Sequence, residues 1–367
     1  MISNNKSKTG VSVICTCYNQ IDYISDALDG FVSQQCTFPF EVIVHDDASS
    51  DGTADVVLRY ATKYPNLIVP IIQSENQHSK GVSGIDIGIS HARYSYIALC
   101  EGDDFWIDPF KLQKQFDFME SHEDYSLCLH NAVIENCNLA MSYLSEFGVD
   151  REKTAEDIIC EGGGEINPTA SFFFRRRMLS RLCKGPVSDH FIMMELVSKG
   201  RVFWFADPMS VYRLNSKGSW SQTKSDPSIE AINNYYEKYQ HGLEQFNMIS
   251  NGRYVDAINE LLDKLEISKL SQILRAEYLG NSISFRDLLL QSDDIFTSIR
   301  LVAEKKLPAS CEVKIRRVIK RIQKRKLIIK NHCTPLHLDQ KGLRRKSWTV
   351  PYAASPKRVR GSAPDDA

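Results

Sequence analysis

Short apolar runs alternate with segments of helical periodicity over the first hundred residues of this chain. The apolar runs are rich in β-branched and aromatic residues, which predicts strands at residues 11–16, 40–44, 67–72 and 94–100. Between these runs apolar residues recur with a helical period, as at Ile24, Leu28 and Phe31. Strands separated by helical segments of about 10–15 residues are typical of a parallel, doubly wound sheet. The pattern therefore predicts an α/β fold.

The pattern is less regular in the rest of the chain. Residues 171–174 and 202–205 predict two further strands, and residues 188–196 predict a helix that begins at a Ser-Asp pair. Residues 228–301 are expected to be mostly helical. The glycine run at residues 162–164 lacks the strand, the GxGxxG spacing and the later acid of a dinucleotide fingerprint, so we expect a loop there.

The composition limits the class of protein to which the chain can belong. A chain of 367 residues with 43% hydrophobic content can bury a full α/β domain and still supply a second element. The ten cysteines show no CxxC pair and no His in register for a zinc site, so we expect reduced core residues. We see no leader segment and no window near the roughly 18 apolar residues of a membrane span. These observations predict a cytoplasmic protein, soluble or peripherally bound.

The net charge of -1 hides an asymmetry. Residues 312–367 hold 16 Lys and Arg against 4 Asp and Glu, a net +12, which leaves -13 for residues 1–311. Within the basic part, residues 313–330 combine apolar positions at helical spacing with many Lys and Arg, which predicts a basic amphipathic helix. Anionic lipid attracts such segments, so we expect contact with an anionic membrane surface. A solvated helix packed on the acidic body is the alternative, and nucleic acid is disfavoured because no aromatic platform is interleaved.

An acidic cluster follows the predicted strand at residues 94–100. Glu101, Asp103 and Asp104 lie at the strand end, directly before Phe105 and Trp106. In open α/β sheets, ligands bind outside the carboxyl ends of the strands, where carboxylates can reach a metal ion and the phosphates that it carries. The cluster therefore predicts a site for a divalent cation, with an acidic surface turn as the alternative.

Three motifs in order suggest a family. Residues 11–19, 44–53 and 101–104, each at a strand end, resemble the family 2 glycosyltransferases with a GT-A fold. Residues 188–190 and 207–213 are similar to the acceptor-side segment of bacterial members. The resemblance covers about residues 9–220. It implies a Rossmann-like, mostly parallel sheet followed by a helical C-terminal region and a basic tail.

The resemblance also implies a UDP-sugar donor. Thr16 and Tyr18 stand where the family holds uridine, and the Tyr ring can stack on the base. Asp47 would accept the uracil N3 hydrogen, because a carboxylate pairs well with an imide N–H. Helix capping is the alternative for Asp47 and for its neighbours Asp46 and Asp51.

Glu101 and Asp103 correspond to the two acids of the family's DxD pattern. Asp103 is the expected ligand of Mn²⁺ or Mg²⁺, and Glu101 is expected to contact the donor or the metal. Asp104 is expected to complete the metal site, as a direct ligand or as a partner that orients the following loop. The metal would neutralise the departing diphosphate.

Asp189 is the candidate general base, because a carboxylate at a helix start can be aimed at the acceptor hydroxyl. Its alternative role is to cap the helix that follows. One base and a single displacement imply inversion at the anomeric carbon. Arg213 either pairs with the diphosphate or makes a structural ion pair, and Asn215 replaces a His that many relatives carry.

These expectations combine into one function. The chain is expected to be a metal-dependent, inverting hexosyltransferase that moves a sugar from a UDP-sugar to a sugar or lipid-linked oligosaccharide hydroxyl, in polysaccharide or O-antigen biosynthesis at the inner face of the membrane. The expected divisions are a GT-A domain over 1–225, a helical region over 226–310 and a basic helix with a disordered tail over 311–367. Alternatives are a noncatalytic nucleotide-sugar-binding or membrane-scaffold protein, and a nucleotidyltransferase, which the lack of a basic triphosphate loop disfavours.

Overall fold

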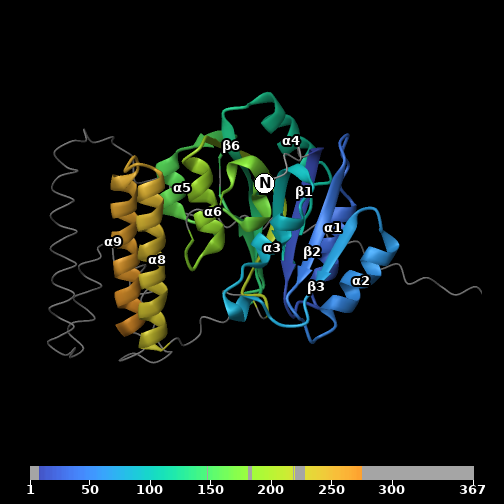
Figure 1. Cartoon of the computed structure of the whole chain (residues 1–367), viewed down its shortest axis with the longest axis horizontal. Helices are drawn as coiled ribbons and strands as arrows, with labels where there is room; N and C mark the ends of the chain where they lie inside the picture. The colour runs from blue at the N-terminus through green and yellow to red at the C-terminus, as the bar shows by residue number, and fades with distance from the viewer. Residues whose placement is uncertain (1–7, 147, 181–183, 218, 220–227, 275–367) are drawn as a thin grey trace, which may run out of the picture.

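One mixed sheet with helices on both faces forms the body of the protein, and a pair of long helices lies at one end (Figure 1). The computed structural model describes residues 8–146, 148–180, 184–217, 219 and 228–274. The sheet order among these residues is β3-β2-β1-β4-β9-β6-β10-β5, with β7 paired to β6 and β8 paired to β10. The longest ladders are parallel, so the predicted α/β class with a mostly parallel sheet is confirmed.

The first four strands are those that the sequence predicts, and all their mutual pairings are parallel. They are β1 (Lys8–Cys17), β2 (Phe40–Asp46), β3 (Ile68–Ile72) and β4 (Tyr94–Glu101). Their central residues are buried because helices cover both faces of this part of the sheet, as is usual for parallel strands. Their carboxyl ends, and the polar turns that follow, therefore meet at one edge.

Helices return the chain between these strands. They are α1 (Ile24–Val32), α2 (Thr53–Lys63), α3 (Gly84–His91) and α4 (Lys111–Ser121), with a short 3₁₀ turn η1 (His78–Lys80). The apolar stripes of α1, α2 and α4 pack into one core, whereas α3 packs into a second core on the other face. This division confirms the doubly wound arrangement.

The second half of the sheet departs from the simple pattern. Its strands are β5 (Phe105–Trp106), β6 (Tyr125–Asn136), β7 (Met141–Leu144), β8 (Arg151–Lys153), β9 (Phe173–Arg175) and β10 (Arg201–Leu214). The strand predicted at 171–174 begins later, because Thr169–Ser171 form a 3₁₀ turn, η2. The strand predicted at 202–205 continues to Leu214, because its later residues still pair with β6 and β5. A further 3₁₀ turn, η3, spans Arg176–Met178.

Four helices pack together at the end of the body that carries the long pair (Figure 1). They are α5 (Ala155–Glu161), α6 (Ser188–Val197), α8 (Ile229–Ile249) and α9 (Val255–Leu274). Buried side chains from all four form a third core, so the helical pair is packed on the sheet domain through α5 and α6. Within the predicted helical region 226–310, the described residues form α8 and α9.

The remaining predictions for the C-terminal part, the helix at 313–330 and the tail at 311–367, lie outside the described residues, as does the predicted boundary at residue 225. None of the described helices is long and apolar enough to cross a membrane. The seven cysteines in the described ranges are free thiols. Four of them are buried, as expected for core residues, whereas Cys36 and Cys160 are partly buried and Cys137 is exposed.

Candidate active site

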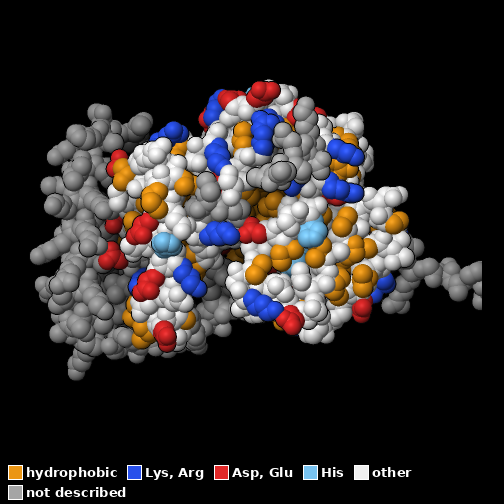
Figure 2. All heavy atoms as spheres, in the orientation of Figure 1, with side chains coloured by type: hydrophobic (Ala, Val, Ile, Leu, Met, Phe, Trp, Pro, Cys, Tyr) orange, Lys and Arg blue, Asp and Glu red, His pale blue; other side chains and the backbone are white. Residues whose placement is uncertain are grey.

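The parallel register brings the first motif residues together. Thr16 pairs with His45 on one side and with Glu101 on the other. Tyr18 follows β1 and is 45% exposed, so its ring is accessible. Figure 2 shows hydrophobic side chains gathered over the part of the sheet that carries β2 and β3, whereas acidic and basic side chains are mixed over α8. We call Thr16, Tyr18, Asp47, Glu101 and Asp103 the strand-end group.

Asp47 ties two segments of this edge together. Its Oδ1 accepts the backbone N–H of Gln77 at 2.7 Å, and its Oδ2 accepts that of His78 at 3.0 Å. Its own N–H donates to the carbonyl of Cys17 at 3.0 Å. Asp47 thus anchors the η1 turn beside the ends of β1 and β2. Each carboxylate oxygen has a further lone pair, so the group can still accept a hydrogen bond from a ligand.

The neighbouring acids make local contacts. The Asp46 carboxylate accepts the N–H of Ser49 at 3.0 Å. The Asp51 carboxylate accepts the N–H and the hydroxyl of Thr53, the first residue of α2, at 3.0 and 2.6 Å. These contacts agree with a role in shaping the turn and the start of the helix.

Asp103 and Asp104 lie in the turn between β4 and β5, and both are buried. The hydroxyl of Ser216 donates to Asp103 Oδ2 at 2.7 Å. The N–H of Arg213 donates to Asp104 Oδ1 at 2.8 Å. Asp104 Oδ2 is buried and has no hydrogen-bond donor within the described part of the chain.

Arg213 stabilises this turn through hydrogen bonds and ion pairs. Its guanidinium donates to the carbonyl of Asp103 at 2.9 Å and pairs with the carboxylates of Asp26 and Glu135. Its planar group also lies 4.5 Å from the centre of the Phe105 ring. Each nitrogen of the Arg213 guanidinium therefore has a partner in the protein, which favours the structural ion pair over a contact with diphosphate.

The carboxyl groups of this region carry raised pKa values. Burial and then the charges of Asp103 and Asp189 raise the pKa of Glu101 to about 8. Burial is also the main cause of the raised pKa of Asp103 and of the much raised pKa of Asp104. Buried carboxylates that repel one another are stabilised by a cation in their midst.

These donors fit a divalent cation that shares its coordination with phosphate. Hard cations such as Mg²⁺ are commonly held by one or two carboxylates plus phosphate oxygens. The buried Asp104 oxygen without a donor and the repulsion within the cluster agree with such an ion. Three or more His, Cys, Asp or Glu side chains with the geometry of an all-protein metal site do not occur in the described ranges. The metal and its ligands remain predictions.

Asp189 lies in the first turn of α6, close to the strand-end group. The residue before the helix is Val187, which has no side-chain cap, so Asp189 is not the capping residue. The N–H of His190 donates to Asp189 Oδ1 at 2.8 Å. Asp189 keeps part of its surface in solvent, yet burial raises the pKa of its carboxyl. Its charge in turn raises the pKa of Glu101, so the two acids lie near one another.

Two neighbours of Asp189 were not predicted as site residues. The Thr169 side chain hydrogen-bonds both Glu101 and Asp189 and favours their ionised forms. These hydrogen bonds offset part of the rise that burial causes in both pKa values. Gly163 lies against Asp189 so closely that an added Cβ would be 2.2 Å from Asp189 Oδ2. The glycine run at 162–164 is indeed a loop, and its closeness to Asp189 gives the reason for glycine at position 163. We call Gly163, Thr169 and Asp189 the α6 group.

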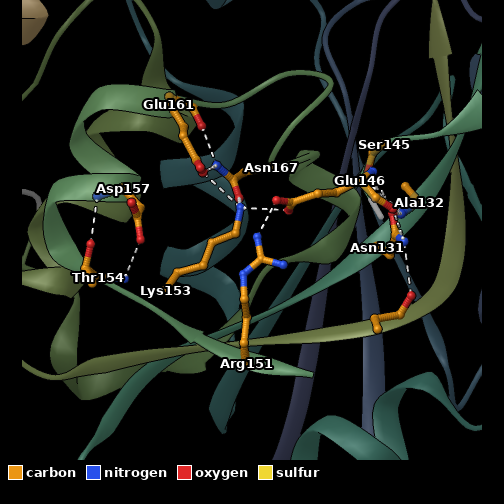
Figure 3. A network of polar contacts seen from close by, with 12 residues as sticks. Asn131, Ala132, Ser145, Glu146, Arg151, Lys153, Thr154, Asp157, Glu161 and Asn167 are labelled. Carbon is orange, nitrogen blue, oxygen red and sulfur yellow. Dashed lines mark hydrogen bonds and ion pairs between the residues drawn. The ribbon is translucent and has the colours of Figure 1, made fainter. Parts of the chain in front are cut away.

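A buried ion-pair network holds the segment that carries Gly163 (Figure 3). The Lys153 ammonium, whose side chain is 1% exposed, lies 2.9 Å from Glu161 Oε2, 3.0 Å from Asn167 Oδ1 and 3.3 Å from Glu146 Oε2. Asn167 also donates from Nδ2 to the carbonyl of Gly162 at 2.7 Å. The two ends of the glycine loop are therefore tied to one buried cation. No pattern of spacing in the sequence predicts this arrangement.

Comparisons with known proteins agree with the motifs. Residues 12–183 match the family described as Glycosyl transferase family 2. An uncharacterized protein of Mycobacterium tuberculosis is 32% identical over 64% of this chain and 65% of its own length, so the chain spans just under two thirds of that relative. The poly(ribitol-phosphate) beta-glucosyltransferase of Bacillus spizizenii is 32% identical over 31% of this chain and 18% of its own length.

A solved structure, TarS residues 1–349 of S. aureus in complex with UDP-GlcNAc, is 18% identical with a TM-score of 0.48, over 77% of this chain and 84% of that one. The family match spans β1 to β4, the acidic turn and the glycine loop, which together carry the strand-end group. Residues 12–183 of this chain belong to glycosyl transferase family 2.

Proposed function

We propose that this chain transfers a sugar from a UDP-sugar to a hydroxyl of an acceptor, with inversion at the anomeric carbon. The observation that carries the proposal is that the Thr169 side chain hydrogen-bonds both Glu101 and Asp189. These acids come from distant parts of the chain, yet the charge of one raises the pKa of the other. The strand-end group and the α6 group thus border the same space, as donor and acceptor sites must in a direct transfer.

The strand-end group would bind the UDP moiety. Thr16 lies beside the ends of β2 and β4, and the exposed ring of Tyr18 is available to stack on uracil. Asp47 would accept the imide hydrogen of the base with its remaining lone pairs. Glu101, next to Thr16 in the sheet, would contact the ribose or the phosphates.

Mn²⁺ or Mg²⁺ would be held by Asp103, with Asp104 contributing its buried oxygen or orienting the turn. When bound, the ion supplies charge that neutralises the departing diphosphate. Ser216 holds Asp103 by a hydrogen bond at 2.7 Å. The guanidinium of Arg213 donates to the carbonyl of Asp103, and the backbone N–H of Arg213 donates to the Asp104 carboxylate. The site is thereby fixed before a ligand arrives.

Asp189 would act as the general base. Its carboxylate takes the proton of the acceptor hydroxyl while the hydroxyl oxygen forms a bond to the anomeric carbon. The bond from that carbon to the diphosphate breaks, and UDP leaves with the electron pair. A raised pKa suits this role, because a base works best when its pKa lies near the working pH. One displacement converts a UDP-α-sugar into a β-linked product, which agrees with the name of the B. spizizenii relative.

The acceptor is proposed to be a growing polysaccharide or a lipid-linked oligosaccharide, and the transfer a step of surface-polysaccharide assembly. The basic segment at 313–330 would hold the protein at the anionic inner face of the membrane. Liposome flotation with and without anionic lipid tests this placement. Binding to neutral vesicles alone contradicts it.

The direct test of the function is UDP release. The purified chain is incubated with UDP-sugars, Mn²⁺ or Mg²⁺ and a lipid-linked oligosaccharide, with GDP-mannose as the comparison donor. We expect UDP release from at least one UDP-sugar, dependent on the divalent cation, and a β-linked product by NMR. Asp47→Asn should weaken binding of UDP, because one acceptor of the imide hydrogen is lost. An α-linked product, or transfer from the GDP-sugar alone, contradicts the proposal.

A further inference from the structure

His190 joins three helices directly beside Asp189. Its imidazole is 1% exposed. Nε2 lies 3.2 Å from the carbonyl oxygen of Ile158 in α5, and Nδ1 hydrogen-bonds the hydroxyl of Tyr239 in α8. A helix from the C-terminal pair therefore contacts the residue that follows the proposed base.

The partners of the ring define its tautomer. A carbonyl oxygen can only accept, so Nε2 carries the hydrogen and donates to Ile158. Nδ1 is then an acceptor, and the hydroxyl of Tyr239 is the donor. Burial lowers the pKa of His190 to about 4, so the ring is neutral at physiological pH. Both ring nitrogens are satisfied, and the ring has one orientation.

Because the ring of His190 is fixed, its backbone N–H is also held in place beside Asp189. Its N–H donates to Asp189 Oδ1 at 2.8 Å. On the opposite side the glycine loop closes the space: an added Cβ at Gly162 would lie 3.7 Å from the His190 ring, and one at Gly163 would lie 2.2 Å from Asp189 Oδ2. Asp189 is therefore held between a fixed backbone and a close loop.

Helix α8 is closely packed on α6. An added Cβ at Gly242 of α8 would lie 2.5 Å from the ring of Phe191, the residue after His190. The ring of Phe191 also lies 5.3 Å from that of Tyr239, centre to centre. Tyr239 is buried and is therefore held where its hydroxyl meets His190.

We propose that Tyr239 is a positioning residue for the base: its hydroxyl fixes the ring of His190, which aims the carboxylate of Asp189 at the acceptor. This inference rests on the proposed function, in which Asp189 accepts the proton. Helix α8 lies outside the residues that match the family. In this inference it nevertheless helps to orient the carboxylate of Asp189. Helix α8 of the C-terminal pair is then required for full turnover.

The test removes one oxygen atom. Tyr239→Phe keeps the ring and its packing but leaves Nδ1 of His190 without a donor. We expect kcat to fall about 10-fold, because a small misplacement of a catalytic group costs one to two orders of magnitude in rate. KM for the UDP-sugar and the Kd of UDP should stay within about twofold, because the strand-end group is untouched.

Tyr236→Phe is the matched control. Tyr236 lies on the same helix and is similarly buried, but its hydroxyl donates to Ser268 Oγ of α9 at 2.8 Å instead of facing His190. Both variants should lower the Tm to a similar extent, and only Tyr239→Phe should lower kcat. An unchanged kcat in Tyr239→Phe, or an equal fall in both variants, overturns the inference while wild-type transfer stands. A wild-type chain that releases no UDP overturns the proposed function itself.

Discussion

The strand-end group and the α6 group are held in different ways. The first depends mainly on backbone hydrogen bonds: the N–H of Gly102 donates to the carbonyl of Thr16 at 2.9 Å, and that of Asp47 to the carbonyl of Cys17 at 3.0 Å. Ser216 and Arg213 add side-chain hydrogen bonds to Asp103. Side chains from separate segments place the second, through Lys153 and Asn167 on one side and His190 and Tyr239 on the other. Single substitutions should therefore disturb the α6 group more easily than the strand-end group.

The largest expected effect on stability comes from the network behind the glycine loop. Lys153→Met leaves Glu161 and Glu146 without their buried cation, and breaking a buried ion pair on one side typically costs about 3–5 kcal/mol. Urea denaturation measures the loss. Arg201→Met is the control, because its ion pairs with Asp124 and Glu152 are exposed and should contribute little. Equal losses in both variants contradict the role given to the network.

A pH titration of stability tests the buried imidazole. The folded-state pKa of His190 is about 4, below its ordinary value of 6.5, so the unfolded chain binds more protons between these two values. Stability should therefore fall as pH drops through this window, by on the order of 3 kcal/mol from this group. In His190→Gln the fall should be shallower than in the wild type. An unchanged slope in His190→Gln contradicts the buried neutral ring.

A substitution in the glycine loop should give a smaller effect, seen in the rate of transfer. Gly163→Ala places a methyl group in contact with the Asp189 carboxylate, and we expect kcat to fall about 10²-fold through misplacement of the base. Gly164→Ala is the control: its φ of +72° makes alanine strained, but nothing lies within 4 Å of the added Cβ. Steady-state kinetics should show the loss of kcat in Gly163→Ala only. A similar kcat for the two variants contradicts a close fit between loop and base.

The same contrast explains how much could be predicted from the sequence. The strands, the helices between them and the acids at the strand ends follow from local periodicity and from the rule that parallel strands end at one edge. Thr169 and Tyr239 carry no local signal, because they reach Asp189 and His190 only through the order of β9 in the sheet and the packing of α8 on α6. The polar role of Arg213 likewise depends on Asp26 and Asp103, which lie far away in the chain.

The central claim is that the strand-end group binds the donor while Asp189 performs the proton transfer. It is tested most directly by measuring the Kd of UDP with Mn²⁺ and the rate of transfer in Asp189→Asn and Asp103→Asn. We predict that Asp189→Asn keeps the Kd within about twofold and loses about 10³-fold in rate, the scale of a general base, whereas Asp103→Asn loses both. If Asp189→Asn weakens UDP binding as much as it slows transfer, the division between the two groups is wrong.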